Sequence, residues 1–167
     1  MNASTYPDVV DLVSHRGPML LLDDVVHLDH HGIIVRLTVR QDGLFDRAGE
    51  VPAWAGVEYM AQAMSALNGY RLREQGLAVR LGFLADTQEF RSKVRAFRCG
   101  DVLYVSAQSE LETAEGLGAF NCRIESRENG VPNVLCEARV NAYAPHDPER
   151  YYAEAQQALV ASKGTGL

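Results

Sequence analysis

The chain has 167 residues, of which 47% are hydrophobic and 23% charged, and its formal net charge is −6. This composition is typical of a globular protein and excludes collagen-like, low-complexity and disordered chains. The acidic balance argues against nucleic acid as the main partner. No segment is long enough and free enough of charge to span a bilayer.

The N-terminal residues and the cysteines indicate the compartment. The first four residues have neither the basic nor the apolar stretch of a signal peptide, so we expect no secretion. Cys99, Cys122 and Cys136 cannot all pair, and they form no Cys-x-x-Cys motif. We therefore expect reduced thiols in a cytoplasmic protein.

The hydrophobic pattern predicts a single α+β domain over residues 1–167, with a core at about residues 8–143 and a partly helical C-terminal extension at residues 144–167. In chain order we expect a short helix at 7–13, two strands at 19–28 and 33–40, and a polar loop at 41–50. A long helix at 52–73, two further strands at 102–111 and 119–125, and a final helix at 151–161 follow. Asn129-Gly130 is a strong hairpin signal before one more strand.

The long helix carries the main functional candidate. Its apolar and small residues cover nearly every direction, which is typical of a buried helix. Glu58, Gln62 and Ser65 form one narrow polar stripe at i, i+4 and i+7. A carboxylate in such surroundings needs a partner or holds a proton with a raised pKa. We interpret Glu58 as a general acid/base in a cleft; a structural carboxylate that accepts hydrogen bonds from a loop is the alternative.

The start of this helix offers a second chemical feature. We expect the backbone N–H groups of Ala53 and Trp54 to be free at the helix N-terminus, with the positive end of the helix dipole behind them. Donors of this kind polarise a thioester carbonyl or hold an enolate oxygen. Glu58 lies just over one turn further along, so the carboxyl group and the N–H groups are placed to act on one substrate.

Several segments of the chain resemble bacterial 3-hydroxyacyl-ACP dehydratases of the FabZ type. Residues 14–23 resemble the opening motif PHRYPFLLVDR of that family, and residues 58–62 resemble the motif EAMAQ on its central helix. Residues 91–101 are similar to its basic strand ending in Gly-Asp. The variant at residues 51–62 looks closest to the ApeP-like branch, which is associated with aryl-polyene gene clusters. The resemblance covers about residues 8–143.

The resemblance implies a hotdog fold, in which a curved antiparallel sheet wraps around the long helix. It also implies a dimer, either with a second copy or with a FabZ-like dehydratase. The implied substrates are acyl thioesters on acyl carrier protein or CoA, in fatty-acid or aryl-polyene biosynthesis. The chain has no phosphate-cradling loop or nucleotide fingerprint, so we expect no soluble cofactor, and we expect no metal.

A basic segment suits an acidic carrier. Residues 71–98 hold seven Lys and Arg against three acidic residues, a local charge of +4. One interpretation is a solvated strand face; the other is a docking patch for an acidic or phosphate-bearing partner. Because acyl carrier protein is acidic, the resemblance favours docking, at Arg91, Lys93, Arg95 and Arg98.

One departure from the family pattern limits the possible activities. In those dehydratases a His in the motif GHFPG, fourteen residues before the acid, takes the proton from C2, and the acid protonates the leaving C3 hydroxyl. Counting back from Glu58 gives Leu44, followed by Phe45. Leu44 has no lone pair and cannot act as the base. We expect substrate contacts from Leu44, Phe45, Ala53, Trp54 and Gln62.

None of the five histidines is an evident replacement for this base. His15 falls in the opening motif and is interpreted as structural. His27, His30 and His31 lie at or near a predicted turn, and adjacent histidines on a strand point in different directions, which disfavours a metal site. His146 lies between two prolines and is expected at the surface.

These observations leave three functional hypotheses. The first is a dehydratase subunit in a mixed dimer, in which a FabZ-like partner supplies the missing His opposite Glu58. The second is a hotdog thioesterase, in which Glu58 activates water for attack on a thioester. The third is a non-catalytic partner that stabilises another enzyme, with Glu58 holding a loop.

Overall fold

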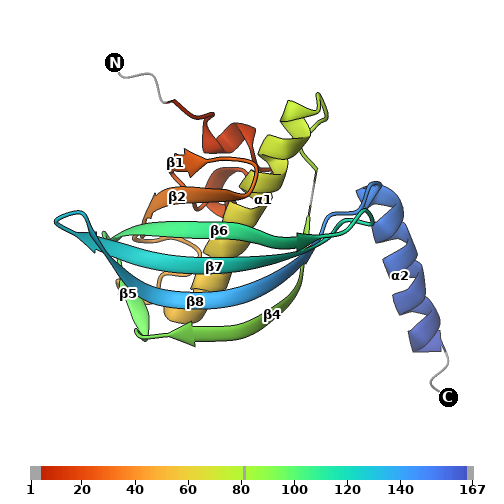
Figure 1. The fold of residues 1–167 in the computed structure, drawn as a ribbon. Helices are drawn as coiled ribbons and strands as arrows, with labels where there is room; N and C mark the ends of the chain where they lie inside the picture. Colours follow the sequence, from red (N-terminus) through yellow and green to blue (C-terminus); the bar gives the residue numbers. More distant parts are fainter. Residues whose placement is uncertain (1–4, 81, 165–167) are drawn as a thin grey trace.

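An antiparallel sheet curved around one long helix forms the centre of the computed structural model, which describes residues 5–80 and 82–164 (Figure 1). The strand order is β1-β2-β6-β7-β8-β4, and all neighbouring strands are antiparallel. The strands are β1 Asp24–Leu28, β2 Gly32–Thr38, β4 Phe83–Ser92, β6 Val102–Glu112, β7 Leu117–Glu128 and β8 Val131–Tyr143. The predicted hotdog fold is therefore confirmed.

The long helix is also confirmed, although its first turn differs from the prediction. A 3₁₀ turn, η3 Ala53–Ala55, leads into α1 Gly56–Glu74. The helix packs against β2, β6, β7 and β8, and its apolar side chains are buried in the main core cluster. Gly69 allows a close approach, because a Cβ there would lie 1.8 Å from the backbone oxygen of Leu12. The N-terminal segment can therefore cross the helix directly.

The N-terminal segment is less regular than predicted. The helix expected over residues 7–13 is a single 3₁₀ turn, η1 Val9–Asp11. The strand expected over residues 19–28 begins only at Asp24, after a second 3₁₀ turn, η2 Gly17–Met19. The reason is that the backbone of this segment bonds to a helix side chain instead of a neighbouring strand: Leu21 N–H donates to Gln62 Oε1 at 3.0 Å.

A second, two-stranded sheet was not predicted. It pairs β3 Glu50–Pro52 with β5 Ala96–Arg98. Strands of three residues are too short to show an alternating pattern. Its first strand, β3, leads directly into η3 and α1, whereas β5 follows the helix in the chain.

The second half of the chain agrees with the predicted hairpins. Asn129 and Gly130 both have positive φ, 51° and 80°, as a tight two-residue hairpin turn requires. Phe120, Cys122 and Ile124 face the core, as their alternation predicted. All three cysteines are unpaired.

The C-terminal extension is helical, as predicted, and forms α2 Pro148–Gly164. It projects away from the sheet (Figure 1). Aromatic contacts hold its first turn: the ring centroid of Tyr151 lies 5.1 Å from that of Phe83 and 5.2 Å from that of Tyr143. Residues 165–167 lie outside the described residues. Among the described residues, no helix is long and apolar enough to cross a membrane.

Candidate active site

Glu58 lies in the first turn of α1 and has two polar neighbours. Gln62 Nε2 donates a hydrogen bond to Glu58 Oε1 at 2.9 Å, and His15 Nε2 lies 3.8 Å from the same oxygen. The Glu58 side chain is 31% exposed. Of the two states expected for this carboxylate, a partner or a bound proton, the structure shows partners, and the side chain is half-buried. Both contacts fall on Oε1, which leaves Oε2 without a partner among the described residues.

Gln62 anchors this arrangement. Its side chain is completely buried, and its amide joins α1 to the N-terminal segment. Oε1 accepts the Leu21 N–H at 3.0 Å, while Nε2 donates to Met19 O at 2.7 Å and to Glu58. Both amide hydrogens are thus engaged within the chain. The structure places Gln62 behind the acid as a support, so a direct hydrogen bond from it to substrate is not available.

His15 is the functional candidate that sequence reasoning underestimated. The Ser14–Arg16 stretch lies between η1 and η2 and brings the imidazole beside α1. The side chain is 24% exposed, and its Nδ1 is buried without a hydrogen-bond partner. The motif match at His15 was visible in the sequence, but its distance to Glu58 was not, because the two residues are 43 positions apart.

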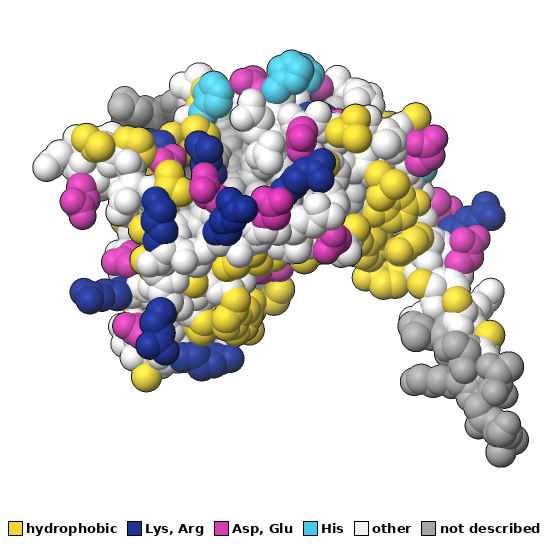
Figure 2. Space-filling model, turned by 60° about the horizontal axis from the view of Figure 1, so that its bottom comes forward, with side chains coloured by type: hydrophobic (Ala, Val, Ile, Leu, Met, Phe, Trp, Pro, Cys, Tyr) yellow, Lys and Arg dark blue, Asp and Glu magenta, His cyan; other side chains and the backbone are white. Residues whose placement is uncertain are grey.

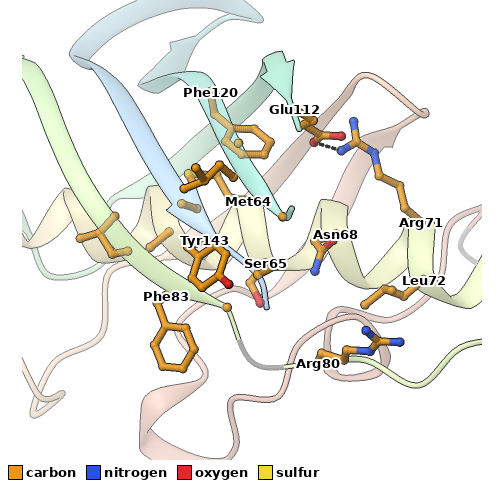
Figure 3. A pocket seen from close by; sticks show the side chains of 18 of the residues that line it. Met64, Ser65, Asn68, Arg71, Leu72, Arg80, Phe83, Glu112, Phe120 and Tyr143 are labelled. Carbon is orange, nitrogen blue, oxygen red and sulfur yellow. Dashed lines mark hydrogen bonds and ion pairs between the residues drawn. The ribbon is translucent and has the colours of Figure 1, made fainter. Parts of the chain in front are cut away.

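A cavity of about 400 Å³ begins at Glu58 and His15 and follows α1 toward its C-terminal end. From Glu58 to Leu72 the helix rises about 21 Å. The helix wall includes Met64, Ser65 and Asn68, and these side chains face Phe120 and Tyr143 of the sheet across the cavity (Figure 3). The volume and the largely apolar lining suit an extended acyl chain.

The far end of the cavity is polar. Arg71 forms an ion pair with Glu112, and Arg80 lies nearby (Figure 3). Arg80 donates to His146 O at 3.0 Å, so the chain leading into α2 is tied to this end. Among the described residues, no group of three or more His, Cys, Asp or Glu is arranged to hold a metal ion.

Leu44 and Phe45 line a different cavity, of about 420 Å³, which Glu58 does not reach. Phe45 packs edge-to-face on Trp54, with ring centroids 5.8 Å apart. Asp46 fixes the loop by accepting hydrogen bonds from the backbone N–H groups of Asp42 and Gly49, each at 2.8 Å. These two bonds hold the pKa of Asp46 below its usual value. Within one chain, the position of the family's His is therefore separated from the acid.

The expectation of free N–H groups at the helix start is wrong for Ala53. Its N–H donates to Arg95 O at 2.9 Å, as a continuation of the pairing between β3 and β5. Ala53 is also buried, whereas the Trp54 side chain is 58% exposed. The helix start is thus already occupied by the second sheet at the position where an oxyanion donor was predicted.

The basic residues expected to dock a carrier are exposed on β4, on β5 and on the turn between them. Arg91 forms an ion pair with Glu89 at 3.3 Å. Lys93, Arg95 and Arg98 have no acidic side-chain partner among the described residues. Figure 2 shows Lys and Arg side chains gathered at the end of the molecule opposite α2.

Comparison with known proteins assigns the family. The family model ApeP-like, described as ApeP dehydratase, matches residues 7–153. The chain belongs to the ApeP-like family of dehydratases. A comparison with curated protein sequences finds no match.

Solved structures agree with this ApeP-like assignment. A chain of the dehydratase heterocomplex ApeI:P from Xenorhabdus doucetiae is 29% identical, with a TM-score of 0.79 over 89% of this chain and 97% of that one. The uncharacterized protein PH1136 from Pyrococcus horikoshii is 14% identical, with a TM-score of 0.58 over 85% and 97%. A hypothetical thioesterase with coenzyme A from Streptococcus pneumoniae is 12% identical, with a TM-score of 0.54 over 72% and 84%. The last two show only the shared fold.

The ApeP-like chain thus combines a supported carboxyl group with an acyl-sized cavity. Elimination of water from a 3-hydroxyacyl thioester needs a base at C2 and an acid at the C3 oxygen. Glu58 lines the cavity and has one free carboxyl oxygen, which suits the acid. Leu44, which lies in the other cavity, provides no base.

Proposed function

We propose that this chain is the acid-bearing subunit of a mixed dehydratase dimer that acts on 3-hydroxyacyl groups carried by acyl carrier protein. The observation that carries the proposal is the arrangement of Glu58. Gln62 holds its Oε1 at 2.9 Å, Oε2 is free, and the residue lies at the end of an acyl-sized cavity. Leu44, which corresponds to the family's His by its spacing from Glu58, lines a separate cavity and supports the absence of a base in this chain.

The reaction divides between two subunits. A His of the partner takes the proton from C2, and the electron pair of that C–H bond forms the C2–C3 double bond. The C3–O bond breaks as protonated Glu58 gives its proton to the departing hydroxyl group. The products are a 2-enoyl thioester and water. At the end the His of the partner carries the proton from C2, and Glu58 is left as a carboxylate. The second site of the dimer, which contains Leu44, lacks a base, so each dimer has one active site.

The outer edge of β4 offers a place for the partner. This strand has ten residues and pairs only with β8, so one of its edges is unpaired. A second hotdog subunit can continue the sheet there. The similar heterocomplex ApeI:P consists of dehydratase components, which supports a mixed pair for this chain as well.

The carrier docks, in this proposal, on Lys93, Arg95 and Arg98. These cations are exposed and have no acidic partner within the described part of the chain. An acidic carrier gains long-range attraction from such a patch, and most of the gain is in the association rate. Arg98 lies on β5, whose partner strand β3 leads into η3 and α1.

The structure offers less support for a thioesterase. That activity needs N–H donors for the oxyanion that forms when water attacks the thioester. The Ala53 N–H, one of the two donors expected, is bound to Arg95 O at 2.9 Å. Dehydration also builds charge on the thioester oxygen when C2 loses its proton, but that charge leaves with the C3 hydroxyl group, which Glu58 protonates, whereas the tetrahedral intermediate of hydrolysis keeps a full charge on this oxygen.

The test is a mass-spectrometric assay of 3-hydroxyacyl-ACP with this chain and a FabZ-like dehydratase that carries the motif His, alone and together. We expect dehydration by the mixture, and we expect Glu58→Gln to lower its kcat by about 100-fold or more. Glu74→Gln, an exposed change on the same helix, is the matched control and should stay within about twofold. Unchanged activity of the Glu58→Gln mixture would leave only a stabilising role, and release of free thiol would indicate a thioesterase.

A gain-of-function variant tests the place of the base. We expect Leu44→His to give this chain dehydratase activity without the FabZ-like subunit, because each half of a homodimer then offers both a His and an acid. Adding Glu58→Gln to that variant should abolish the activity. If Leu44→His stays inactive while the mixture is active, Leu44 does not stand at the base position.

A further inference from the structure

His15 and Gln62 contact the same oxygen of Glu58 from two sides. Gln62 Nε2 donates to Oε1 at 2.9 Å, and His15 Nε2 lies 3.8 Å from Oε1. The second distance is beyond an ordinary hydrogen bond. Catalytic contacts are often long in the absence of substrate and shorten when it binds. The imidazole is thus placed to become a second donor to the acid.

The surroundings of Nδ1 determine the tautomer of His15. This nitrogen is buried and has no hydrogen-bond partner among the described residues. A buried N–H without an acceptor is costly, because the group loses its bonds to water and gains none in the protein. A neutral imidazole has a single N–H. Because Nδ1 has no acceptor here, we place that hydrogen on Nε2. The Nε2–H then faces Glu58.

We propose that His15 is a positioning residue that holds Glu58 for proton transfer through a neutral Nε2–H. With two donors directed at Oε1, the proton that the acid transfers resides on Oε2, the oxygen left free for the substrate. This proposal rests on the dehydratase function proposed above. His15 acts through Glu58 and does not touch the reacting carbons.

The same geometry argues against His15 as the missing base. A base must take up a proton and become an imidazolium, which would place a second N–H on the buried Nδ1 without an acceptor. No described residue offers an acceptor for that second hydrogen. The base therefore still has to come from the partner subunit.

Other charged groups near the pair are engaged elsewhere. Arg16 donates to the backbone oxygens of Val13 and His15, at 2.6 and 2.7 Å, and forms no ion pair with Glu58 within the described part of the chain. At the far end of the cavity, Arg71 is paired with Glu112, and Arg80 binds His146 O. No other ion pair of Glu58 is present among the described residues, so His15 is its only titratable partner.

Two substitutions separate positioning from packing and from base catalysis. His15→Leu keeps much of the volume and removes the donor. We expect it to lower the kcat of the mixed dehydratase by about 10- to 100-fold with KM changed less than about twofold, since misplacing a reacting group has effects of this size. His15→Gln replaces the imidazole with an amide donor that does not titrate. We expect it to restore kcat to within about fivefold, with the pH profile unchanged.

Each alternative outcome overturns the proposal. Full activity of both variants would show that His15 only packs. Equal loss in both, with one limb of the pH profile missing, would show that His15 titrates as a base. Melting temperatures of the variants identify any loss that comes from unfolding.

A readout without substrate keeps this proposal separate from the dehydratase proposal. Long-range ¹H–¹⁵N NMR of histidine-labelled protein reports which ring nitrogen carries the proton. We expect the Nε2–H tautomer at His15 at neutral pH, and we expect its Nε2 resonance to shift in Glu58→Gln. A predominant Nδ1–H tautomer or an imidazolium would overturn the positioning role, whether or not the mixed complex dehydrates any substrate.

Discussion

Gln62 lies one helical turn beyond Glu58 on α1, and its buried amide donates to the Glu58 carboxyl group at 2.9 Å. The same amide binds Met19 O and Leu21 N–H, so Gln62→Leu would leave these two backbone groups without partners and would remove the closest donor of the acid. We expect this variant to lose about 2–5 kcal/mol of unfolding free energy, since each unsatisfied buried group costs about 1–3 kcal/mol. Urea unfolding measures the loss.

The activity of the same variant gives an independent measurement. Without Gln62 the acid loses its closest donor, so kcat should fall more than KM rises. Gln157→Leu, at an exposed position of α2, is the matched control and should change the unfolding free energy by less than about 0.5 kcal/mol. Equal stability of the two leucine variants would contradict the supporting role of Gln62.

The crossing of the N-terminal segment over α1 depends on Gly69. An added Cβ would lie 1.8 Å from Leu12 O, and backbone atoms at that distance must move apart. We expect Gly69→Ala to destabilise the fold by about 3 kcal/mol, although alanine favours helices. Because η1 precedes the His15 segment, activity should fall as well. Gly82→Ala is the control, since its Cβ would meet nothing closer than 3.8 Å.

The basic residues predict a dependence on the carrier and on salt. Reversing Lys93, Arg95 and Arg98 to Glu should lower kcat/KM for acyl-ACP at least tenfold at low ionic strength, and the difference should shrink as salt screens the charges. Activity on a short pantetheine thioester, which lacks the acidic carrier, should stay within about twofold of the parent chain. An equal loss on both substrates would contradict docking and indicate damage to the site.

Cys122 gives a prediction about pH. Burial raises the pKa of its thiol from 9.0 to about 12, so the thiolate fraction at pH 8 falls about a thousandfold. Iodoacetamide should label Cys122 only after unfolding, whereas the more accessible Cys99 should react earlier in the native protein. Peptide mass spectrometry follows both sites.

The raised pKa of Cys122 also makes the free energy of unfolding depend on pH. The pKa of Cys122 is raised in the folded state, so its contribution is complete below about pH 9 and is lost as the pH rises toward about 12. Cys122→Ala should remove this alkaline decline. A decline that persists unchanged in that variant would assign it to another group, such as Tyr59, whose pKa burial also raises to about 12.

Long, strongly patterned elements were predictable, and short ones were not. The alternation around Ile124 and the Asn129-Gly130 pair identified the strands and their hairpin because each pattern reports local geometry. The N-terminal segment was assigned to a strand on its apolar run, but its backbone bonds to Gln62, which lies 41 residues from Leu21. No pattern in the sequence around Leu21 predicts that hydrogen bond.

The candidate site shows the same division. Glu58 stood out because it is the only charged residue between Glu50 and Arg71, along the apolar part of the helix. Ala53 was misjudged because a helix that begins at a proline suggests free N–H groups, and the pairing of β3 with β5 that occupies this one is invisible in three-residue strands. The closeness of His15 to Glu58 depends on the path of the chain between η1 and η2.

The outer edge of β4 has a further consequence for the isolated chain. The pairing of β4 with β8 shifts register between Leu84 and Asp86 and again between Gln88 and Arg91, and Glu89 has a φ of 53°. Such irregularities, with charges along the strand, make it a poor template for cross-β stacking. The unpaired edge of β4 is thus less prone to fibrillar stacking than a flat edge of the same length.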